Sequence, residues 1–363
     1  MEAKKQKIRL ALFLLVVLLL LGGTAAVVFL VDPFFHYHAP WFGLKAVEDE
    51  KEYQIPGMID HFSYDSILAG SSVVMSMDLQ ELDREFSCNA IKAVGGSAPA
   101  PLLAWYLERA FARQELRYVF YGLDVFSFYN DPDMPVIDED VSYLVNANPF
   151  DDVRYLWNKD IITEKIPQMI QQSADENYDW GMIYQVNVGA KTGPEEVLKM
   201  HCPNPNAVIR PQPVDYRRED VAENLTRLET LVREHPDTEF LFFIPPYSVL
   251  WWDNAYESGL WDTYLYTLED CMARLLSYDN VRMYATYFND KEVIGNLYLY
   301  MDYIHAATPV TEQLPAQLSG AEQEITVSGY KQELQQLSDV FFAFRRKVEA
   351  EGYGFVFEVE QNW

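Results

Sequence analysis

An uninterrupted apolar run near the N-terminus constrains this chain more than any other feature. From Leu10 to Val31 the sequence reads LALFLLVVLLLLGGTAAVVFLV, 22 residues without a charged side chain. As a helix this run reaches about 33 Å, roughly the thickness of a bilayer's hydrocarbon core. Residues 1–9 carry four basic side chains and one acid. Because basic flanks stay on the cytoplasmic side, we expect a single-pass anchor with everything after Asp32 outside the cytoplasm.

A cleaved signal peptide is the alternative interpretation of the same run. Its leucine-dense core is followed by small residues, Gly22–Ala26, that could form a cleavage site. The apolar run continues through Val27–Val31, which is longer than a signal core and favours an uncleaved anchor. Both interpretations place the remaining residues, about 320 of them, outside the cytoplasm.

The charge of the chain argues against nucleic acid as a partner. The formal net charge is −27, so the part after the basic N-terminus is near −30, whereas nucleic-acid binding needs a basic surface. The three cysteines, Cys88, Cys202 and Cys271, are far apart and form no zinc motif. The sequence also has no Walker, GxGxxG or HExxH motif. We therefore expect neither a metal nor an organic cofactor.

Beyond the apolar run, buried-type strands alternate with amphipathic helices. This alternation predicts a three-layer α/β/α fold with a mostly parallel five-stranded sheet. The strands are expected at 64–69, 90–94, 117–123, 239–244 and 281–286, and the main helices at 99–113, 219–234, 263–276 and 326–350. The alternating residues 354–360 predict a last edge strand.

The predicted organisation has four parts. They are a basic tail at 1–9, a transmembrane anchor at 10–31, a juxtamembrane segment at 32–62 and an extracytoplasmic domain at 63–363. About 90 residues, 127–216, separate the third strand from the next helix, too long for an ordinary connection. We interpret them as an insertion over the carboxyl ends of the strands, where α/β proteins bind ligands.

Two short motifs could carry chemistry. The first strand ends in Gly70-Ser71-Ser72, which puts a hydroxyl at a strand-to-helix turn whose backbone N–H groups can bind an oxyanion. A serine at such a turn is also commonly a helix N-cap. Late in the chain, Asp302 and His305 stand three apart, so the carboxylate can orient the imidazole as a general base. Together the two motifs favour a serine hydroxyl assisted by a histidine general base.

On these residues the chain resembles the SGNH/GDSL hydrolase superfamily, in particular membrane-anchored bacterial proteins similar to those of teichoic-acid D-alanylation and alginate O-acetylation. The resemblance implies a flavodoxin-like fold, Ser72 as nucleophile, with Ser71 the weaker choice, and Asp302 and His305 completing the triad. It also implies an oxyanion donor at Gly95 or Gly96. The similarity reaches from about residue 32 to residue 330, but its motifs are short and the insertion lies outside them.

The sequence departs from this family at one important position. The third block of the family is Gly-x-Asn-Asp, whose Asn donates to the oxyanion, whereas the corresponding strand end here is Gly122-Leu123-Asp124-Val125. An ionised Asp124 cannot donate and would repel the developing charge. We expect either a protonated Asp124, an oxyanion hole built from Ser72 and Gly96 N–H groups with Asn130 as a further candidate, or a slow or inactive site.

Other polar and aromatic groups are interpreted as structural. His36 and His38 have metal-like spacing but suit packing at a membrane interface, and the acidic stretch 131–140 lacks an EF-hand pattern. Trp251 and Trp252 follow a strand end, where they could stack on a sugar or pack in the core. These features do not change the predicted site.

Two functions remain in competition. The first is a serine esterase or O-acyltransferase acting on a cell-envelope or exported polysaccharide, with a membrane-bound acyltransferase as a partner that could supply acyl groups. The second is a non-catalytic accessory protein that uses the same fold as a scaffold in an envelope-modification complex. Asp124 favours the second, and the set of Ser72, Asp302 and His305 favours the first.

Overall fold

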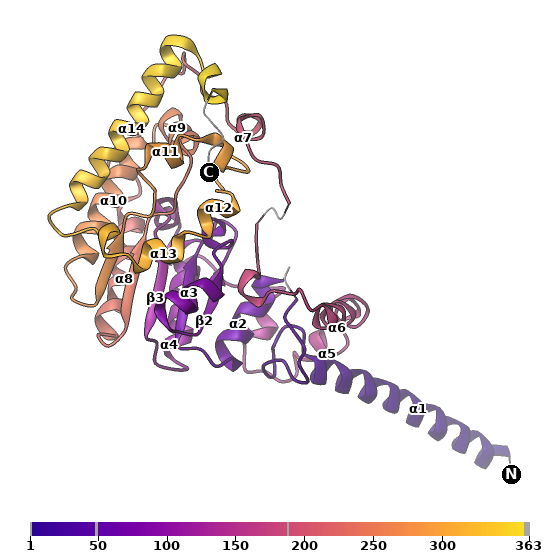
Figure 1. The fold of residues 1–363 in the computed structure, drawn as a ribbon. Coiled ribbons are helices and arrows are strands. Elements are labelled where there is room, and N and C mark those ends of the chain that lie inside the picture. Colours follow the sequence, from indigo (N-terminus) through magenta and orange to yellow (C-terminus); the bar gives the residue numbers. More distant parts are fainter. Residues whose placement is uncertain (1, 48–49, 187–188, 359–363) are drawn as a thin grey trace. The chain divides into compact units, whose positions relative to one another are not determined.

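The computed structural model describes residues 2–47, 50–186 and 189–358 (Figure 1). The chain divides into two compact units. The first unit comprises Met1–Phe62 and Ile137–Trp180, and the second comprises Ser63–Val136 and Gly181–Trp363. The long connection between the third strand and the next long helix is therefore shared, because residues 137–180 fold with the N-terminal segment.

The second unit is built on a five-stranded parallel sheet. Its strands are β1 (Ser66–Gly70), β2 (Ala90–Val94), β3 (Tyr118–Gly122), β4 (Glu239–Phe243) and β5 (Val281–Tyr284). Every neighbouring pair is parallel and the spatial order is β2-β1-β3-β4-β5. The strands are short apolar runs that are almost completely buried, as a sheet covered on both faces requires. This order is the flavodoxin-like one, so the predicted α/β fold class is confirmed.

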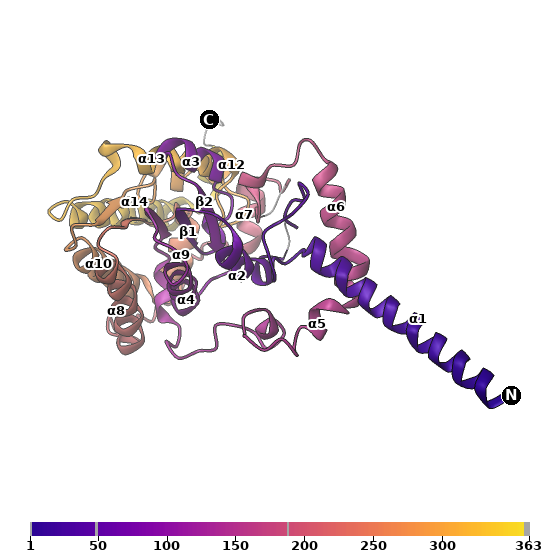
Figure 2. The ribbon, with the colours of Figure 1, turned by 90° about the horizontal axis from the view of Figure 1, so that it is seen from below.

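Helices cover both faces of the sheet. Figures 1 and 2 show α3 (Leu79–Phe86) and α13 (Leu314–Ser319) on one face, and α4 (Ala100–Phe111), α8 (Arg218–Glu234) and α10 (Trp261–Leu275) on the other. Right-handed crossovers require this division, since the chain moves one way from β1 to β2 and the opposite way from β2 to β3. The order therefore reverses between β1 and β3, and the crevice at their carboxyl ends is where such folds bind ligands.

The remaining elements of the second unit are shorter or peripheral. The helices are α7 (Pro194–Met200), α9 (Val249–Glu257), α11 (Lys291–Ile294), α12 (Thr308–Thr311) and α14 (Tyr330–Glu351), and the 3-10 turns are η1 (Ser72–Val74), η2 (Val125–Tyr129), η6 (Leu297–Leu299), η7 (Ala321–Gln323) and η8 (Gly354–Phe357). A further 3-10 turn, η5 (Trp180–Met182), joins the two units.

The predicted C-terminal edge strand was wrong. Residues Gly354–Phe357 form a 3-10 turn, and the rest of that segment from residue 359 lies outside the described residues. The edge of the sheet beside β5 is already used, because the Ile325 N–H donates to the Met283 carbonyl and the Ala285 N–H donates to the Gln323 carbonyl. The alternating pattern of residues 354–360 gives no indication that residues 323–325 occupy the edge of the sheet beside β5.

The first unit begins with α1 (Glu2–Val31), which by length and composition is long and apolar enough to cross a membrane. The other elements are α2 (Lys51–His61), η3 (Ser142–Leu144), α5 (Val153–Leu156), the π-helical turn η4 (Ile161–Lys165) and α6 (Ile166–Ala174). The C-terminal end of α1 contributes to a small core in which Val28 packs with Phe34, Tyr155 and Ile161.

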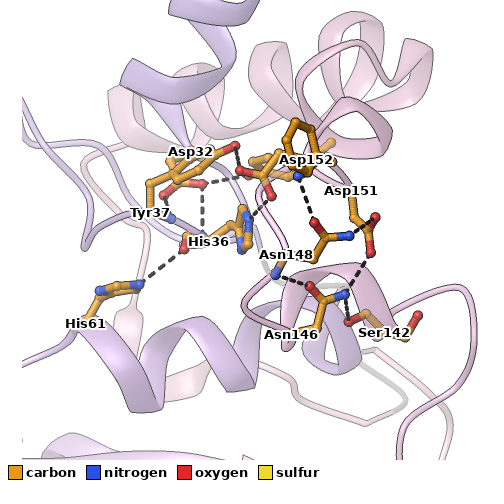
Figure 3. Close-up of polar contacts among 11 residues, drawn as sticks. Asp32, His36, Tyr37, His61, Ser142, Asn146, Asn148, Asp151 and Asp152 are labelled. Carbon is orange, nitrogen blue, oxygen red and sulfur yellow. Dashed lines mark hydrogen bonds and ion pairs between the residues drawn. The ribbon is translucent and has the colours of Figure 1, made fainter.

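A polar network closes the turn that follows α1 (Figure 3). Asp32 is fully buried and accepts hydrogen bonds from the backbone N–H groups of His36, Tyr37 and His38 and from the hydroxyl of Tyr155. Burial raises the pKa of Asp32, although the hydroxyl of Tyr155 and the backbone N–H groups of Tyr37 and His38 oppose the rise. The network fixes the direction in which the chain leaves the helix.

Candidate active site

The turn after β1 separates the roles of two adjacent serines. Ser71 is buried and caps η1, its side-chain oxygen accepting from the Val73 N–H at 3.5 Å. Ser72, the first residue of η1, is partly exposed. The helix N-cap expected of a serine at this turn is therefore Ser71, whereas the hydroxyl of Ser72 faces the pocket.

Two glycines allow this turn to pack closely against the sheet. A Cβ at Gly70 would lie 2.7 Å from a methyl group of Val74, and a Cβ at Gly122 would lie 2.8 Å from the other methyl group. Val74 is fully buried and belongs to η1. The absence of side chains at the ends of β1 and β3 thus lets the serine turn settle against the carboxyl edge of the sheet.

Asp302 and His305 lie on a closed loop at the same edge. An antiparallel bridge between Tyr300 and Ala306 closes the loop, and the Met301 N–H donates to the His305 carbonyl. One Asp302 oxygen accepts the backbone N–H groups of Ile304 and His305, at 2.7 and 2.8 Å. The other oxygen lies 2.7 Å from His305 Nδ1. The carboxylate therefore orients both the loop and the ring.

The two motifs meet although 233 residues separate them. His305 Nε2 lies 2.8 Å from Ser72 Oγ. Burial would raise the pKa of Asp302, but the His305 ring and the two backbone N–H donors outweigh it and hold that pKa below its usual value. An ionised carboxylate, an imidazole and a hydroxyl thus stand in hydrogen-bonded sequence, the arrangement that activates a serine for attack on a carbonyl.

Asp124 lies behind the serine turn. Its side chain is fully buried, with one oxygen accepting the Ser71 N–H at 3.1 Å and the other accepting the hydroxyl of Tyr247. It is not among the residues that line the pocket beside Ser72. Burial raises the pKa of Asp124 to about 6, against the lowering effect of Tyr247 and Ser71. The structure thus places this carboxylate as a support of the Ser71 backbone.

The loop after β2 supplies the remaining oxyanion candidate. The Gly95 N–H donates to the Gly70 carbonyl at 3.2 Å, so it is used within the sheet edge. Gly96 is exposed, and the next residue, Ser97, has a positive φ of 47° and lines the pocket. Of the two glycines named from the sequence, Gly95 is thus engaged, whereas Gly96 is exposed beside the pocket-lining Ser97 but does not itself line the pocket. Asn130 instead donates to the Ser127 carbonyl and does not line the pocket.

A pocket of about 260 Å³ opens beside Ser72 and His305. Its other lining residues are Ser71, Ser97, Phe126, Trp251, Asn254, Ala255, Ser258, Leu260, Tyr264 and Ile304. Trp251 stacks between Tyr247 and Tyr264, with ring centroids 4.1 and 5.8 Å away, whereas Trp252 is fully buried in the core. Within the described residues, none of the lining side chains is an acid, a lysine or an arginine, and none comes from 127–216.

The neighbouring charged cluster was missed by sequence reasoning. Arg345 on α14 is 3% exposed and donates to Asp253 and Glu257 of α9, both at 2.7 Å. Asp253 also pairs with His201 Nε2 at 2.8 Å. The guanidinium already neutralises the carboxylates that could otherwise attract a cation. No local pattern links these residues, since 88 positions separate Glu257 from Arg345.

The other histidines noted from the sequence are engaged within the first unit. His38 contacts the carbonyl oxygens of Ala39 and Phe29, both at 2.7 Å, and stacks on Trp41. His36 lies 3.3 Å from Asp152. These contacts fit the structural interpretation of both side chains.

Replacing Asp124 with Asn should flatten part of the pH dependence of stability. Between pH 3.8, the ordinary pKa of an aspartate, and about pH 6, the folded protein binds more protons at Asp124 than the unfolded chain does. The stability of the fold therefore falls as the pH rises through this range. The rise in the pKa corresponds to roughly 3 kcal/mol of stability. Asn stays neutral and can accept the Ser71 N–H while donating to the Tyr247 oxygen.

Urea unfolding of both proteins at pH 4, 5, 6 and 7 measures this effect. The Asn variant should gain stability over the wild type progressively between pH 4 and 7. Parallel curves for the two proteins would mean that Asp124 does not titrate in this range.

Comparisons with known proteins add little to this geometry. No protein-family model matches the chain, and no curated protein matches it. One solved structure, from Streptococcus pneumonia and provisionally described as a platelet activating factor, aligns over 81% of this chain and 92% of its own. Its sequence identity is 12% and the TM-score is 0.36, which is too low to carry an argument.

Proposed function

We propose that this chain is a membrane-anchored serine esterase or O-acyltransferase of the SGNH type that works outside the cytoplasm. The observation that carries the proposal is the hydrogen-bonded series Ser72–His305–Asp302, with heavy-atom distances of 2.8 and 2.7 Å. Its position at the reversal of strand order, beside a pocket, supports the same conclusion.

The chemistry follows from the atoms in reach. Ser72 Oγ attacks an ester carbonyl while His305 Nε2 takes the hydroxyl proton, and Asp302 stabilises the imidazolium that forms. The tetrahedral intermediate collapses as His305 returns the proton to the leaving alcohol, leaving an acyl group on Ser72. Water then releases a carboxylic acid, or a sugar hydroxyl accepts the acyl group. The N–H groups of Ser72 and Gly96 would hold the oxyanion in both steps.

The pocket favours an uncharged acylated sugar as substrate. Its walls combine aromatic rings with hydroxyl and amide groups, a composition that binds neutral carbohydrate by stacking and hydrogen bonding. The domain's strong negative charge would disfavour polyanionic glycans. A cell-envelope or exported polysaccharide carrying neutral acyl esters fits both properties, and a membrane-bound acyltransferase is the partner that could supply or receive the acyl group.

A non-catalytic accessory role is the alternative, and Asp124 is the observation that favours it. The family position that normally donates to the oxyanion is occupied by a carboxylate that supports Ser71. Loss of one oxyanion donor typically costs about 100- to 1000-fold in rate. Such a loss would slow the enzyme without abolishing the activated serine, so activity measurements separate the two roles.

Hydrolysis of 4-nitrophenyl acetate by the purified full-length protein tests the proposal. We expect turnover by the wild type, none above background for Ser72→Ala, and retained turnover for Ser71→Ala, since it is the Ser72 hydroxyl that lies 2.8 Å from His305 Nε2. A folded wild-type protein that gives no turnover, or a Ser72→Ala variant as active as the wild type, would overturn the esterase proposal.

A further inference from the structure

Residues 137–180 of the first unit run alongside the C-terminal half of α1. Val28 of α1 is fully buried and packs with Tyr155 and Ile161. Nearer the N-terminus, the indole N–H of Trp157 donates to the Leu21 carbonyl at 3.0 Å. From Leu21 to Val31 the helix rises about 15 Å. The 137–180 segment therefore accompanies α1 over that length.

The same stretch of α1 presents apolar side chains away from the segment. Leu21 is 44% exposed, Val27 50% and Leu30 43%. If the bilayer ended near Leu21, only Leu10–Leu20, about 17 Å of helix, would cross a hydrocarbon core of about 30 Å. The apolar run Leu10–Val31 is just long enough to cross the hydrocarbon core when all of it is embedded. A bilayer that covers the whole run must also surround whatever packs against its C-terminal half.

The surface of the 137–180 segment next to this contact is itself apolar. Phe150, Val153 and Trp157 lie before, within and just after α5, and they are 83%, 54% and 41% exposed. Exposed aromatic side chains with a satisfied polar group are typical of the membrane interface. Trp157 links this surface to α1 through its hydrogen bond to the Leu21 carbonyl, and this link to a membrane-spanning helix favours acyl chains, rather than a soluble protein, as the occupant of the surface.

The two acidic side chains between Phe150 and Val153 have internal partners. Asp152 accepts the hydroxyl of Tyr37 at 3.0 Å and lies 3.3 Å from His36 Nε2. Asp151 accepts the side-chain amides of Asn146 and Asn148 at 3.0 and 2.6 Å (Figure 3). Because these carboxylates are already hydrogen-bonded within the protein, placing them near lipid costs less than placing unpaired ones there.

We propose that residues 150–157, which comprise α5 and its flanks, are embedded beside α1 in the leaflet that surrounds the C-terminal half of that helix, with Phe150, Val153 and Trp157 contacting lipid acyl chains. The proposal rests on the membrane anchor and is independent of the esterase chemistry. Its consequence is that the first unit is held at the bilayer by two elements, so its orientation is fixed more tightly than a single helix would allow.

Quenching by doxyl-labelled lipids tests this placement in the full chain. Single cysteines at Val153, Phe150, Leu14 and Glu176 would be labelled with bimane, after Cys88 and Cys202 are changed to Ser, in phosphatidylcholine vesicles that contain doxyl-phosphatidylcholine. Leu14 reports the span itself. Glu176 is exposed just beyond α6, which Figure 2 shows leading away from α1, so it is the control within the same unit.

We expect bimane at positions 153 and 150 to be quenched about as strongly as at 14, and at 176 to be quenched little. Strong quenching at 14 together with values at 153 and 150 equal to that at 176 would overturn the proposal while leaving the anchor intact. Absence of quenching at 14 would overturn both the anchor and the embedded segment. Turnover by the same preparations shows separately whether the esterase proposal stands.

Discussion

Replacing Asp302 with Asn should lower kcat for ester hydrolysis by about 10⁴-fold, the loss seen when a triad carboxylate becomes an amide. One Asp302 oxygen is held by the backbone N–H groups of Ile304 and His305. In the Asn variant the amide oxygen must keep that position, so the NH₂ group faces His305 Nδ1. The ring then carries its proton on Nε2 and cannot accept the proton of Ser72.

The kinetics of the variant distinguish this orienting role from a packing role. kcat should fall while KM changes little, because the ground-state contacts with substrate remain. Asp215→Asn, at an exposed position, is the matched control and should behave as the wild type. An Asp302→Asn variant with nearly wild-type kcat would mean that His305 does not act as the general base.

Replacing Arg345 with Met should destabilise the second unit by about 3–5 kcal/mol, the typical cost of breaking a buried ion pair from one side. Met leaves the fully buried Asp253 and the neighbouring Glu257 without their guanidinium donor. Arg345 also donates to the Asn204 carbonyl at 2.6 Å, so the loop before α8 loses an anchor as well.

We expect the substitution to disturb the pocket as well, because α9 carries Asp253 and Glu257 on one side. The same helix presents Trp251, Asn254 and Ala255 to the pocket. Urea unfolding measures the change in stability. The triple variant Arg345→Met, Asp253→Asn, Glu257→Gln removes the unpaired charges and should recover part of the lost stability. A change below about 1 kcal/mol for Arg345→Met alone would mean that solvent reaches the cluster.

Much of the fold could be predicted from the sequence because buried parallel strands leave a local signal. The five apolar runs are found as β1 to β5 within about two residues of the predicted ends, and α8 buries Val221, Leu225, Leu228 and Leu231 as its helical spacing predicts. The β2-β1-β3-β4-β5 order then follows from right-handed crossovers and the flavodoxin-like resemblance.

The features that could not be predicted from the sequence depend on contacts between segments that are far apart in the chain. The role of Asp124 depends on Tyr247, 123 residues later, and the association of α1 with 137–180 depends on side chains such as Tyr155 that resemble any core residue. The predicted Ser72, Asp302 and His305 do come together, whereas the carboxylate at 124 lies behind the turn. Tertiary contacts of this kind produce no periodic pattern in the sequence.

Covalent labelling tests most directly whether Ser72 is an activated nucleophile. A fluorophosphonate probe should leave one adduct, which peptide mapping by mass spectrometry locates on Ser72. The adduct should persist in Ser71→Ala, disappear in Ser72→Ala and form far more slowly in His305→Ala. A folded wild-type protein that acquires no adduct, or one that acquires it at another residue, would contradict the account.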